Sequence, residues 1–374
     1  MSNANQVAYG LEGVIALETE LSLVDGANAS LYYRGYHIDD LVEHATYEAV
    51  VYLLFYGDLP SDEQLAEFRQ KLAAEQEVPQ PVIELLKSLP KYSVPMAMLR
   101  TALSALSHYD PEAEDNSLEA NFRKAIRLTA QSPVLVAAIG RIMQGKEPIA
   151  PRPDLGIAAN FLYMLNGEEG TEVAVKTMDT ALILHAEHGL NASTFAGRVT
   201  VSTLSDIYSA VTTAVGTLKG PLHGGANEAV MKMLLEIGSP DRAEAYVREK
   251  LARKERIMGI GHRVYKTGDP RVKHLKRLSR ELNAQKGTLH WVEISERIEQ
   301  VMKEEKGLLP NVDFYSASAY YALGIPPELY TPIFAVSRMS GWTANFLEQY
   351  RENRLIRPRA AYVGPRDRTI VKSN

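Results

Sequence analysis

Helical periodicity runs through almost the whole chain after its first 45 residues, and this pattern leaves few folds open. Strands that alternate with helices, as an α/β fold requires, are absent from the pattern. The opening segment LSLVDGANASLYYRGYHI has an Asp-Gly turn signal between two short β-prone runs, which predicts a small hairpin. We therefore expect an all-α, multi-helical protein with a small N-terminal β-hairpin.

Glycine and proline divide the helical part into segments. Gly57 is placed to end one helix, and Ser61 with Gln64 has the spacing of a capping box at the start of the next. Pro133 is expected to separate two helices because proline donates no backbone hydrogen bond. The expected helices span residues 46–57, 61–76, 94–108, 118–129, 133–144, 154–165, 171–188, 204–217, 226–236, 241–253, 270–285, 291–305, 313–323 and 327–350.

The last of these helices contains VSRMSGWTANFLEQY, which is apolar on more than one face. A helix of this kind is buried on most sides. The pattern predicts either several layers of helices within one chain or burial of this helix against a second subunit.

Composition excludes several classes of function. At 374 residues the chain fits one large or two ordinary domains, and its net charge of −5 gives no reason to expect nucleic acid or an acidic membrane as a partner. The absence of cysteine rules out disulfides, thiolate nucleophiles and cysteine-bound zinc. Apolar runs are shorter than the roughly 18 residues of a membrane span, and no secretory signal is visible, so we expect a cytoplasmic protein.

Ionisable residues beside glycines or predicted helix ends mark four segments. These are LHAEHGLNAS (184–193), KGPLHGGANEAV (219–230), IMGIGHRVYKTGDPR (257–271) and LPNVDFYSAS (309–318). In the first, His185 and His188 are separated by three positions with Glu187 between them, which matches neither common zinc-protease spacing. Two histidines bonded to backbone, or a metal pair, would both explain this segment. The other histidines outside these segments are expected at exposed helix positions, and we assign them no role; they are His37, His44, His108, His274 and His290.

His223 and His262 each lie beside glycine, near a predicted helix or turn boundary. The positive end of a helix favours a neutral imidazole, which can donate a hydrogen bond to a carbonyl oxygen as negative charge develops there. Local hydrogen bonding at a helix start is the alternative. Asp313, in the first turn of its predicted helix, is either an acid that stabilises the helix dipole or a general base.

Three arginines differ from the rest because they stand beside proline or in segments with little other charge: Arg271, Arg338 and Arg357. Arg338 interrupts an otherwise nearly uncharged helix and has no carboxylate three or four positions away. A carboxylate elsewhere in the fold, or on a ligand, is therefore expected to pair with it.

Taken in order, the four segments resemble the signature segments of the citrate synthase family. SRMSGWTANFLEQ and IRPRAAYVG also resemble its C-terminal segments, and the likeness extends from about residue 9 to 366. The length is similar to that of the short bacterial and archaeal form.

The resemblance implies a Claisen condensation of acetyl-CoA with oxaloacetate, followed by hydrolysis of citryl-CoA to citrate and CoA. It implies that Asp313 removes a proton from the acetyl methyl group and that neutral His223 donates a hydrogen bond to the thioester oxygen. His262 would protonate the ketone oxygen of oxaloacetate. No metal and no cofactor beyond the coenzyme A thioester substrate is implied.

The resemblance also implies how the substrates are held. His188, Arg271 and Arg338 would bind oxaloacetate, together with Arg357 donated across the interface of a homodimer. A small CoA-binding domain, residues 225–324, would interrupt a large dimer-forming domain made of residues 1–224 and 325–374. The implied CoA contacts are Ile257, Met258, Gly259, Ile260 and Gly261 against adenine, and Lys266 on a phosphate.

Three alternatives are open. 2-Methylcitrate synthase, which uses propionyl-CoA, differs only by room for one methyl group, which a pocket discriminates by about 1–3 kcal/mol. A metal-dependent hydrolase would be built around His185, Glu187 and His188, and elemental analysis would distinguish it. A catalytically inactive helical dimer that binds a carboxylate would need only the arginines.

Overall fold

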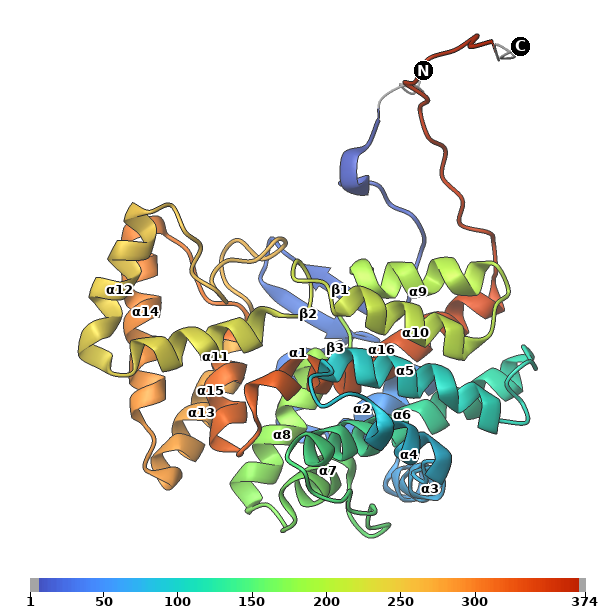
Figure 1. Ribbon diagram of the computed structural model, residues 1–374, viewed down its shortest axis with the longest axis horizontal. Helices are drawn as coiled ribbons and strands as arrows, with labels where there is room; N and C mark the ends of the chain where they lie inside the picture. Colours follow the sequence, from blue (N-terminus) through green and yellow to red (C-terminus); the bar gives the residue numbers. More distant parts are fainter. Residues whose placement is uncertain (1–6, 370–374) are drawn as a thin grey trace, which may run out of the picture.

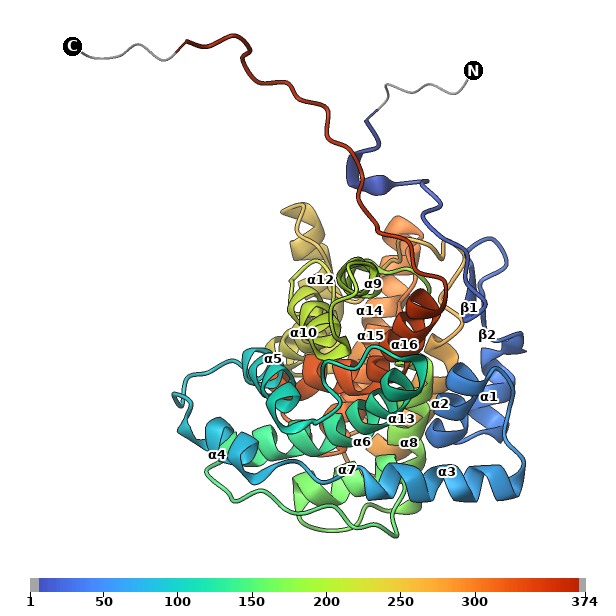
Figure 2. The ribbon, with the colours of Figure 1, turned by 90° about the vertical axis from the view of Figure 1, so that its right-hand side faces the viewer.

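The structure, a computed structural model, describes residues 7–369 and confirms the all-α class. Helices pack around a central helix (Figure 1). One small sheet lies to one side of them, at the right in Figure 2. None of the helices in the described range is long and apolar enough to cross a lipid bilayer.

The sheet confirms the predicted hairpin. Strands β1 (Ser22–Asp25) and β2 (Ser30–Tyr33) pair antiparallel, with Ser22 opposite Tyr33, and the short β3 (Tyr36–His37) adds to β2. The carboxylate of Asp25 accepts hydrogen bonds from the backbone of Ala27 and Asn28, which stabilises the turn.

The first helices form one side of the molecule, and two of their ends are capped as the sequence predicts. Gly57 follows α2 in the left-handed region (φ 95°), and Ser61 and Gln64 form the predicted capping box of α3. The elements are η1 (Tyr9–Leu11), α1 (Ile38–His44), α2 (Tyr47–Tyr56), α3 (Asp62–Ala74), α4 (Gln80–Ser88), α5 (Pro95–Leu106), η2 (Ser107–Tyr109), α6 (Leu118–Met143) and α7 (Ile157–Asn166).

The prediction of a break at Pro133 is wrong, because α6 continues through it from Leu118 to Met143. Pro133 lacks one backbone hydrogen bond, but the stretch from Leu128 to Gly140 is buried on all sides. Burial of this apolar stretch against α16 and α7 outweighs the local cost.

Helix α16 (Tyr330–Arg351) is the centre of the molecule. Nearly all of its residues from Tyr330 to Leu347 are buried, and it packs against α6, α8, α9 and α10 (Figures 1 and 2). Layers of helices within the chain therefore explain its apolar faces, and no second subunit is needed to cover them.

The remaining helices complete two groups. α8 (Glu172–His185), α9 (Ala192–Ser202) and α10 (Ile207–Leu218) lie beside α16, whereas α11 to α15 gather at the other side of the molecule (Figure 1). That second group is α11 (Ala226–Ile237), α12 (Pro240–Ala252), α13 (Val272–Lys286), α14 (His290–Lys306) and α15 (Val312–Ala322), with η3 (Pro327–Leu329) leading back to α16.

Two further expectations need correction. Helices α1, α4 and α9 were not predicted, and α8 ends at His185, so that His188 lies in the loop that follows. His274 was expected to be exposed, but it is 5% exposed and contacts Asp39 of α1 through Nε2 (2.5 Å). Lys273 also donates to Asp39, so these contacts join α13 to α1.

Candidate active site

Loops and helix starts bring the sequence-predicted residues together between the two groups of helices. His188 follows α8, His223 lies between α10 and α11, and His262 lies between α12 and α13. Asp313 stands in the first turn of α15, and Arg338 comes from the middle of α16. Chain segments more than 100 residues apart thus contribute to one cluster.

His223 is held by the start of α9. The backbone N–H of Ser193 donates to His223 Nε2 (3.3 Å), and Ser193 Oγ lies 2.8 Å from the same nitrogen. Trp342 of α16 in turn donates from Nε1 to Ser193 Oγ (3.1 Å). Burial, with a contribution from the positive charge of Arg338, lowers the pKa of His223 to about 4. The ring is therefore neutral at pH 7, with its proton on Nδ1 when Nε2 accepts from Ser193.

His262 is held in the opposite tautomer by its own loop. Its Nδ1 accepts hydrogen bonds from the backbone N–H groups of Val264 (3.0 Å) and Tyr265 (3.1 Å), which leaves the proton of a neutral ring on Nε2. Burial and the nearby charge of Arg271 lower its pKa to about 4. The ring of His188 lies 5.4 Å from it, centroid to centroid, and His188 Nε2 contacts the Tyr265 hydroxyl (3.2 Å).

Asp269 connects the arginine of this site to the helix that carries Asp313. Its two oxygens accept from Nε and a terminal nitrogen of Arg271 (2.9 and 2.7 Å), and its Oδ2 also accepts from the backbone N–H of Val312 (3.0 Å). Asp269 and Arg271 are 6% and 3% exposed. Because such a bidentate pair has one geometry, Asp269 fixes both Arg271 and the start of α15.

Asp313 is a half-buried carboxyl group whose Oδ1 is buried and accepts no hydrogen bond from the described residues. Asn311 accepts from its backbone N–H (3.1 Å) and so caps the helix. Burial raises the pKa of Asp313 to about 6, against the opposing effect of the positive charge of Arg271. The group is thus largely ionised at pH 7 and poorly solvated, as a general base requires.

Arg338 is 2% exposed and has no carboxylate partner in the described part of the chain. Its Nε donates to the backbone oxygen of His185 (2.7 Å), and its guanidinium carbon lies 4.8 Å from the centre of the Phe334 ring. Its charge lowers the pKa values of His188 and His223 in addition to the effect of burial. A buried guanidinium without a protein carboxylate matches the expectation of a ligand carboxylate.

The loop of residues 257–261 is attached to the segment just before α15. Gly261 donates to Leu309 O (2.7 Å), and Asn311 donates to Gly259 O from its backbone (2.9 Å). Gly259 has φ 74°, and a Cβ there would lie 2.9 Å from the Phe314 ring, so only glycine fits. The loop therefore lies beside the start of α15, whereas the exposed Lys266 donates only to backbone oxygens of the His262 turn.

Arg357 is the predicted site residue that the single chain does not bring to the cluster. It lies exposed in the extended segment after α16, which leaves the body of the molecule (Figure 2).

The metal-hydrolase alternative finds no support in the geometry of its residues. His185 donates from Nδ1 to Ala181 O (2.7 Å), and Glu187 accepts from Ser22 and Asn345 side chains. Within residues 7–369 no group of three histidine, aspartate or glutamate side chains is arranged to hold a metal ion.

Sequence reasoning gave no role to several residues that shape the cluster, namely Ser193, Tyr265, Asp269, Asn311 and Trp342. Asp269 stands two positions before Arg271, and this spacing is the one signal that could have identified it. The others contribute through tertiary contacts that no local pattern records.

Within one all-α chain the described residues gather a poorly solvated carboxyl group, two imidazole rings that burial keeps neutral, and a buried guanidinium without a carboxylate partner among them. A sequence model described as the C-terminal domain of citrate synthase matches residues 10–359. The chain belongs to the citrate synthase family.

Individual relatives agree over nearly the whole chain. The chain is 58% identical over 363 residues to citrate synthase 2 of Bacillus subtilis, covering 97% of each protein. It is 46% identical over 364 residues to 2-methylcitrate synthase of Mycobacterium tuberculosis, covering 97% of this chain and 92% of the relative. The citrate synthase of Thermoplasma acidophilum, solved with carboxymethyl coenzyme A and oxaloacetate, superposes with a TM-score of 0.93 at 36% identity, covering 98% of each chain.

Proposed function

We propose that this enzyme condenses acetyl-CoA with oxaloacetate and hydrolyses the resulting citryl-CoA to citrate and CoA. The observation that carries the proposal is how three groups are held. Ser193 and the loop after His262 fix His223 and His262 as opposite tautomers, and Asp313 has a buried oxygen that accepts no hydrogen bond from the described residues. Asp313 is a base whose pKa is raised to about 6, and His223 and His262 are neutral rings whose pKa values are about 4. A base beside two neutral donors is what enolisation and carbonyl attack need.

In the first step Asp313 removes a proton from the methyl group of acetyl-CoA. A methyl group beside a thioester is a very weak carbon acid, so a carboxylate ionises it only if the developing enolate oxygen is stabilised at the same time. His223 donates its Nδ1–H to that oxygen, with Ser193 holding Nε2. The electron pair of the broken C–H bond becomes the enol double bond, and the proton resides on Asp313.

In the second step the enol carbon attacks the ketone carbon of oxaloacetate and forms the new carbon–carbon bond. His262 gives the proton on Nε2 to the ketone oxygen, which becomes the hydroxyl group of citryl-CoA. His262 is then one proton short. Water attacks the thioester carbonyl and gives one proton back to His262, the carbon–sulfur bond breaks, and the thiolate takes the proton held by Asp313 to leave as CoA. Citrate is the other product.

Oxaloacetate is held through its carboxylates by His188, Arg271 and Arg338, with Arg357 of the partner subunit completing the set in a homodimer. Asp269 already occupies one side of Arg271, so Arg271 is positioned before substrate binds. The exposed extension that carries Arg357 supports donation to a second copy.

Coenzyme A binds to a small domain of residues 225–324, set into a large domain of residues 1–224 and 325–374. The loop Ile257–Gly261 receives the adenine, and Lys266 binds a phosphate. Hydrogen bonds join this loop to the segment just before α15, the helix that carries Asp313, and this closeness of the proposed CoA loop to the proposed base supports the assignment. The enzyme works in the cytoplasm with no metal and no cofactor beyond its substrates.

2-Methylcitrate synthase is the second candidate, because relatives of that name are 45–46% identical to the chain. Thiol release measured with acetyl-CoA and with propionyl-CoA, each with oxaloacetate, distinguishes the two. We expect kcat/KM to be higher for acetyl-CoA. A higher kcat/KM for propionyl-CoA would instead assign the enzyme to 2-methylcitrate synthesis.

The pH dependence of kcat/KM for acetyl-CoA follows from the proposed base. The carboxyl of Asp313 must be ionised, so kcat/KM should fall as pH drops below about 6, by about tenfold per unit. The histidines gain protons only near pH 4 and do not contribute above it. Steady-state rates between pH 5 and about 8 test this; a kcat/KM that stays constant down to pH 5, as for a base with the ordinary aspartate value of 3.8, would contradict it.

Substitution Arg338→Lys should weaken oxaloacetate binding. Lysine keeps the charge but loses the planar fork, and a hydrogen bond to a charged group contributes about 1.5–3 kcal/mol, so KM should rise about 10- to 100-fold. Arg198→Lys is the matched control, because Arg198 is also buried but pairs with Glu348. Equal effects on KM from both variants would contradict a binding role for Arg338.

Trp342→Phe should lower kcat about fivefold and leave KM for oxaloacetate unchanged. Phenylalanine retains the packing but loses the hydrogen bond to Ser193 Oγ, worth about 1 kcal/mol, and with it part of the support for His223. Trp291→Phe is the control, since Trp291 of α14 makes no such bond. A change in stability alone, with kcat retained, would show that Trp342 is only structural.

A further inference from the structure

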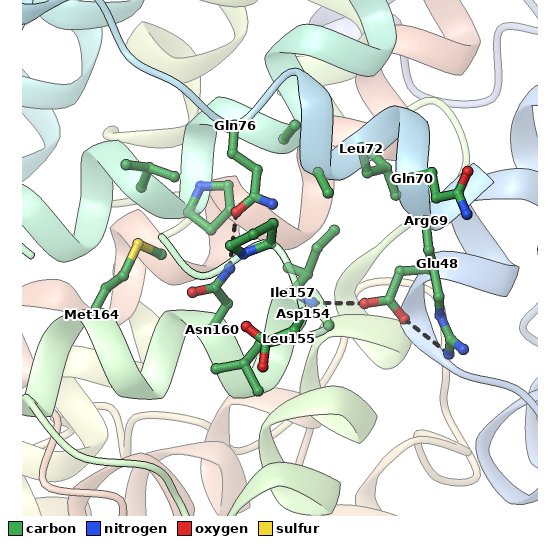
Figure 3. A pocket seen from close by; sticks show the side chains of 16 residues that line it. Glu48, Arg69, Gln70, Leu72, Gln76, Asp154, Leu155, Ile157, Asn160 and Met164 are labelled. Atoms are coloured by element: carbon green, nitrogen blue, oxygen red, sulfur yellow. Dashed lines mark hydrogen bonds and ion pairs between the residues drawn. The ribbon is translucent and has the colours of Figure 1, made fainter. Parts of the chain in front are cut away.

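A cavity with a volume of about 300 Å³ lies between α3, α6 and α7 (Figure 3). None of the side chains proposed to act in catalysis or substrate binding lines it. Its volume is at the lower end of the range for small-molecule sites, which is roughly 300–1,000 Å³.

One end of the cavity is apolar. Met164 of α7 lies at the end away from Glu48, whereas Leu72 of α3 lies near Gln70 and Arg69 (Figure 3). Pro133 and Val134 of α6 also line the cavity. The polar amides between the two ends are already paired, because Asn160 donates from Nδ2 to Gln76 Oε1 (2.8 Å) and to Arg152 O (2.7 Å). This end therefore suits a hydrocarbon body.

The other end carries a buried carboxylate, one oxygen of which is only loosely paired. Glu48 is 4% exposed, and its Oε1 accepts from the backbone N–H of Ile157 (2.6 Å). Its Oε2 accepts no hydrogen bond from the described residues, and the nearest cationic atom is a terminal nitrogen of Arg69 at 3.8 Å. Arg69 is 46% exposed and also bonds to Thr46 Oγ1, so its pairing with Glu48 is loose.

The backbone around Glu48 leaves space for its carboxylate. A Cβ at residue 156 would lie 2.9 Å from Glu48 Oε1, so glycine at this position leaves room for the carboxylate. Figure 3 shows Glu48 and Arg69 at one end of the cavity and Met164 at the other. The cavity is thus apolar at one end and has a fixed acceptor at the other.

The charges around the cavity favour a cation over an anion. Glu48 and Asp154 line it, and Arg69 is the one guanidinium that does so. Asp154 is paired with Arg152, so the charge that counts here is that of Glu48. Near Glu48 lies Asp179, 9% exposed, whose pKa is raised by burial and by the charge of Glu48. An anionic ligand would meet this negative charge in a poorly solvated place, whereas an ammonium group would relieve it.

We propose that this cavity is a binding site for a small apolar molecule that carries one organic ammonium group. The ammonium donates to Glu48 Oε2, and the hydrocarbon body packs against Val134 and Met164. The site is independent of the condensation reaction proposed above.

Calorimetric titration of the full-length protein with 2-phenylethylammonium tests the site, with 2-phenylethanol and 3-phenylpropionate as neutral and anionic probes. We expect the ammonium to bind at least tenfold more tightly than the alcohol, and the carboxylate not to bind. Glu48→Gln keeps an acceptor for Ile157 but removes the charge, so it should abolish this tenfold preference. Ala73→Phe, on the half-buried face of α3 that lines the cavity, should abolish binding of both probes.

Oxaloacetate-dependent thiol release at the wild-type rate shows that each variant is folded. Equal affinity for the ammonium and the alcohol would overturn the proposal, as would an ammonium affinity that neither substitution changes. Displacement of the bound ammonium by oxaloacetate or CoA would also overturn it, because the probe would then occupy the catalytic site.

Discussion

Replacement of Asp313 by asparagine is expected to lower kcat by about 10²- to 10⁴-fold, the usual contribution of a general base. Asparagine has nearly the same shape but accepts no proton from the methyl group of the acyl donor. KM for oxaloacetate should change little, since the arginines and His188 are untouched. Thiol release at saturating substrates measures the effect.

The same substitution should not destabilise the fold, which separates loss of catalysis from misfolding. Burial raises the pKa of Asp313 from 3.8 to about 6. At pH values between these two, the folded state therefore keeps a proton on Asp313 that the unfolded state has lost. The carboxylate therefore reduces the free energy of unfolding progressively as pH rises from about 4 to 6, by up to roughly 3 kcal/mol above this range. Asp313→Asn removes this cost.

Asp241→Asn is the matched control, because Asp241 is an exposed acid in the first turn of α12. It should leave both kcat and stability at pH 7 almost unchanged. If Asp313→Asn retained kcat within a few-fold of wild type, another group would have to be the base. If it unfolded the protein at pH 7, the inference that the buried carboxylate lowers the free energy of unfolding would be wrong.

His223→Asn is expected to reduce kcat and kcat/KM for acetyl-CoA by about 10²- to 10³-fold each, the usual result of removing a single donor to a developing oxyanion. Asparagine is too short to reach both Ser193 and the thioester oxygen. Equal losses in the two constants indicate an interaction made only in the transition state. Steady-state kinetics of thiol release provide both constants.

His108→Asn serves as the control for this variant, since His108 is exposed and far from the cluster in sequence. A rise in KM for acetyl-CoA with unchanged kcat would contradict the proposed role, because it would mean that His223 only binds the substrate. Retention of activity at low pH through a charged ring is not expected, as the pKa of His223 is lowered to about 4.

Much of the fold was predictable because local patterns and tertiary packing agree. The hairpin around Asp25, the capping box at Ser61 and the helix end at Gly57 were each visible in a few residues. Pro133 misled the prediction, because its local cost is small beside the apolar burial of α6 against α16. Helix α9 was missed because its sequence, ASTFAGRVTVS, is poor in strong helix formers and is stabilised by packing on α10 and α16.

Only those site residues whose sequence neighbours indicate a role could be predicted. His223, His262 and Asp313 stand beside glycines or helix starts, so the sequence alone identified them as candidates. The contact of Trp342 with Ser193 spans 149 residues, and the bond from Val312 to Asp269 spans 43. Nothing in a short stretch of sequence records such pairs, so the tautomers of the two histidines could be inferred only from the structure.

Condensation is tested most directly by following CoA thiol and citrate together in one reaction with acetyl-CoA and oxaloacetate. We expect both products to appear in equal amounts, and neither to appear when oxaloacetate is left out. Thiol release without oxaloacetate would identify a thioesterase, and thiol release without citrate would mean that no carbon–carbon bond forms. Either result would contradict the mechanism.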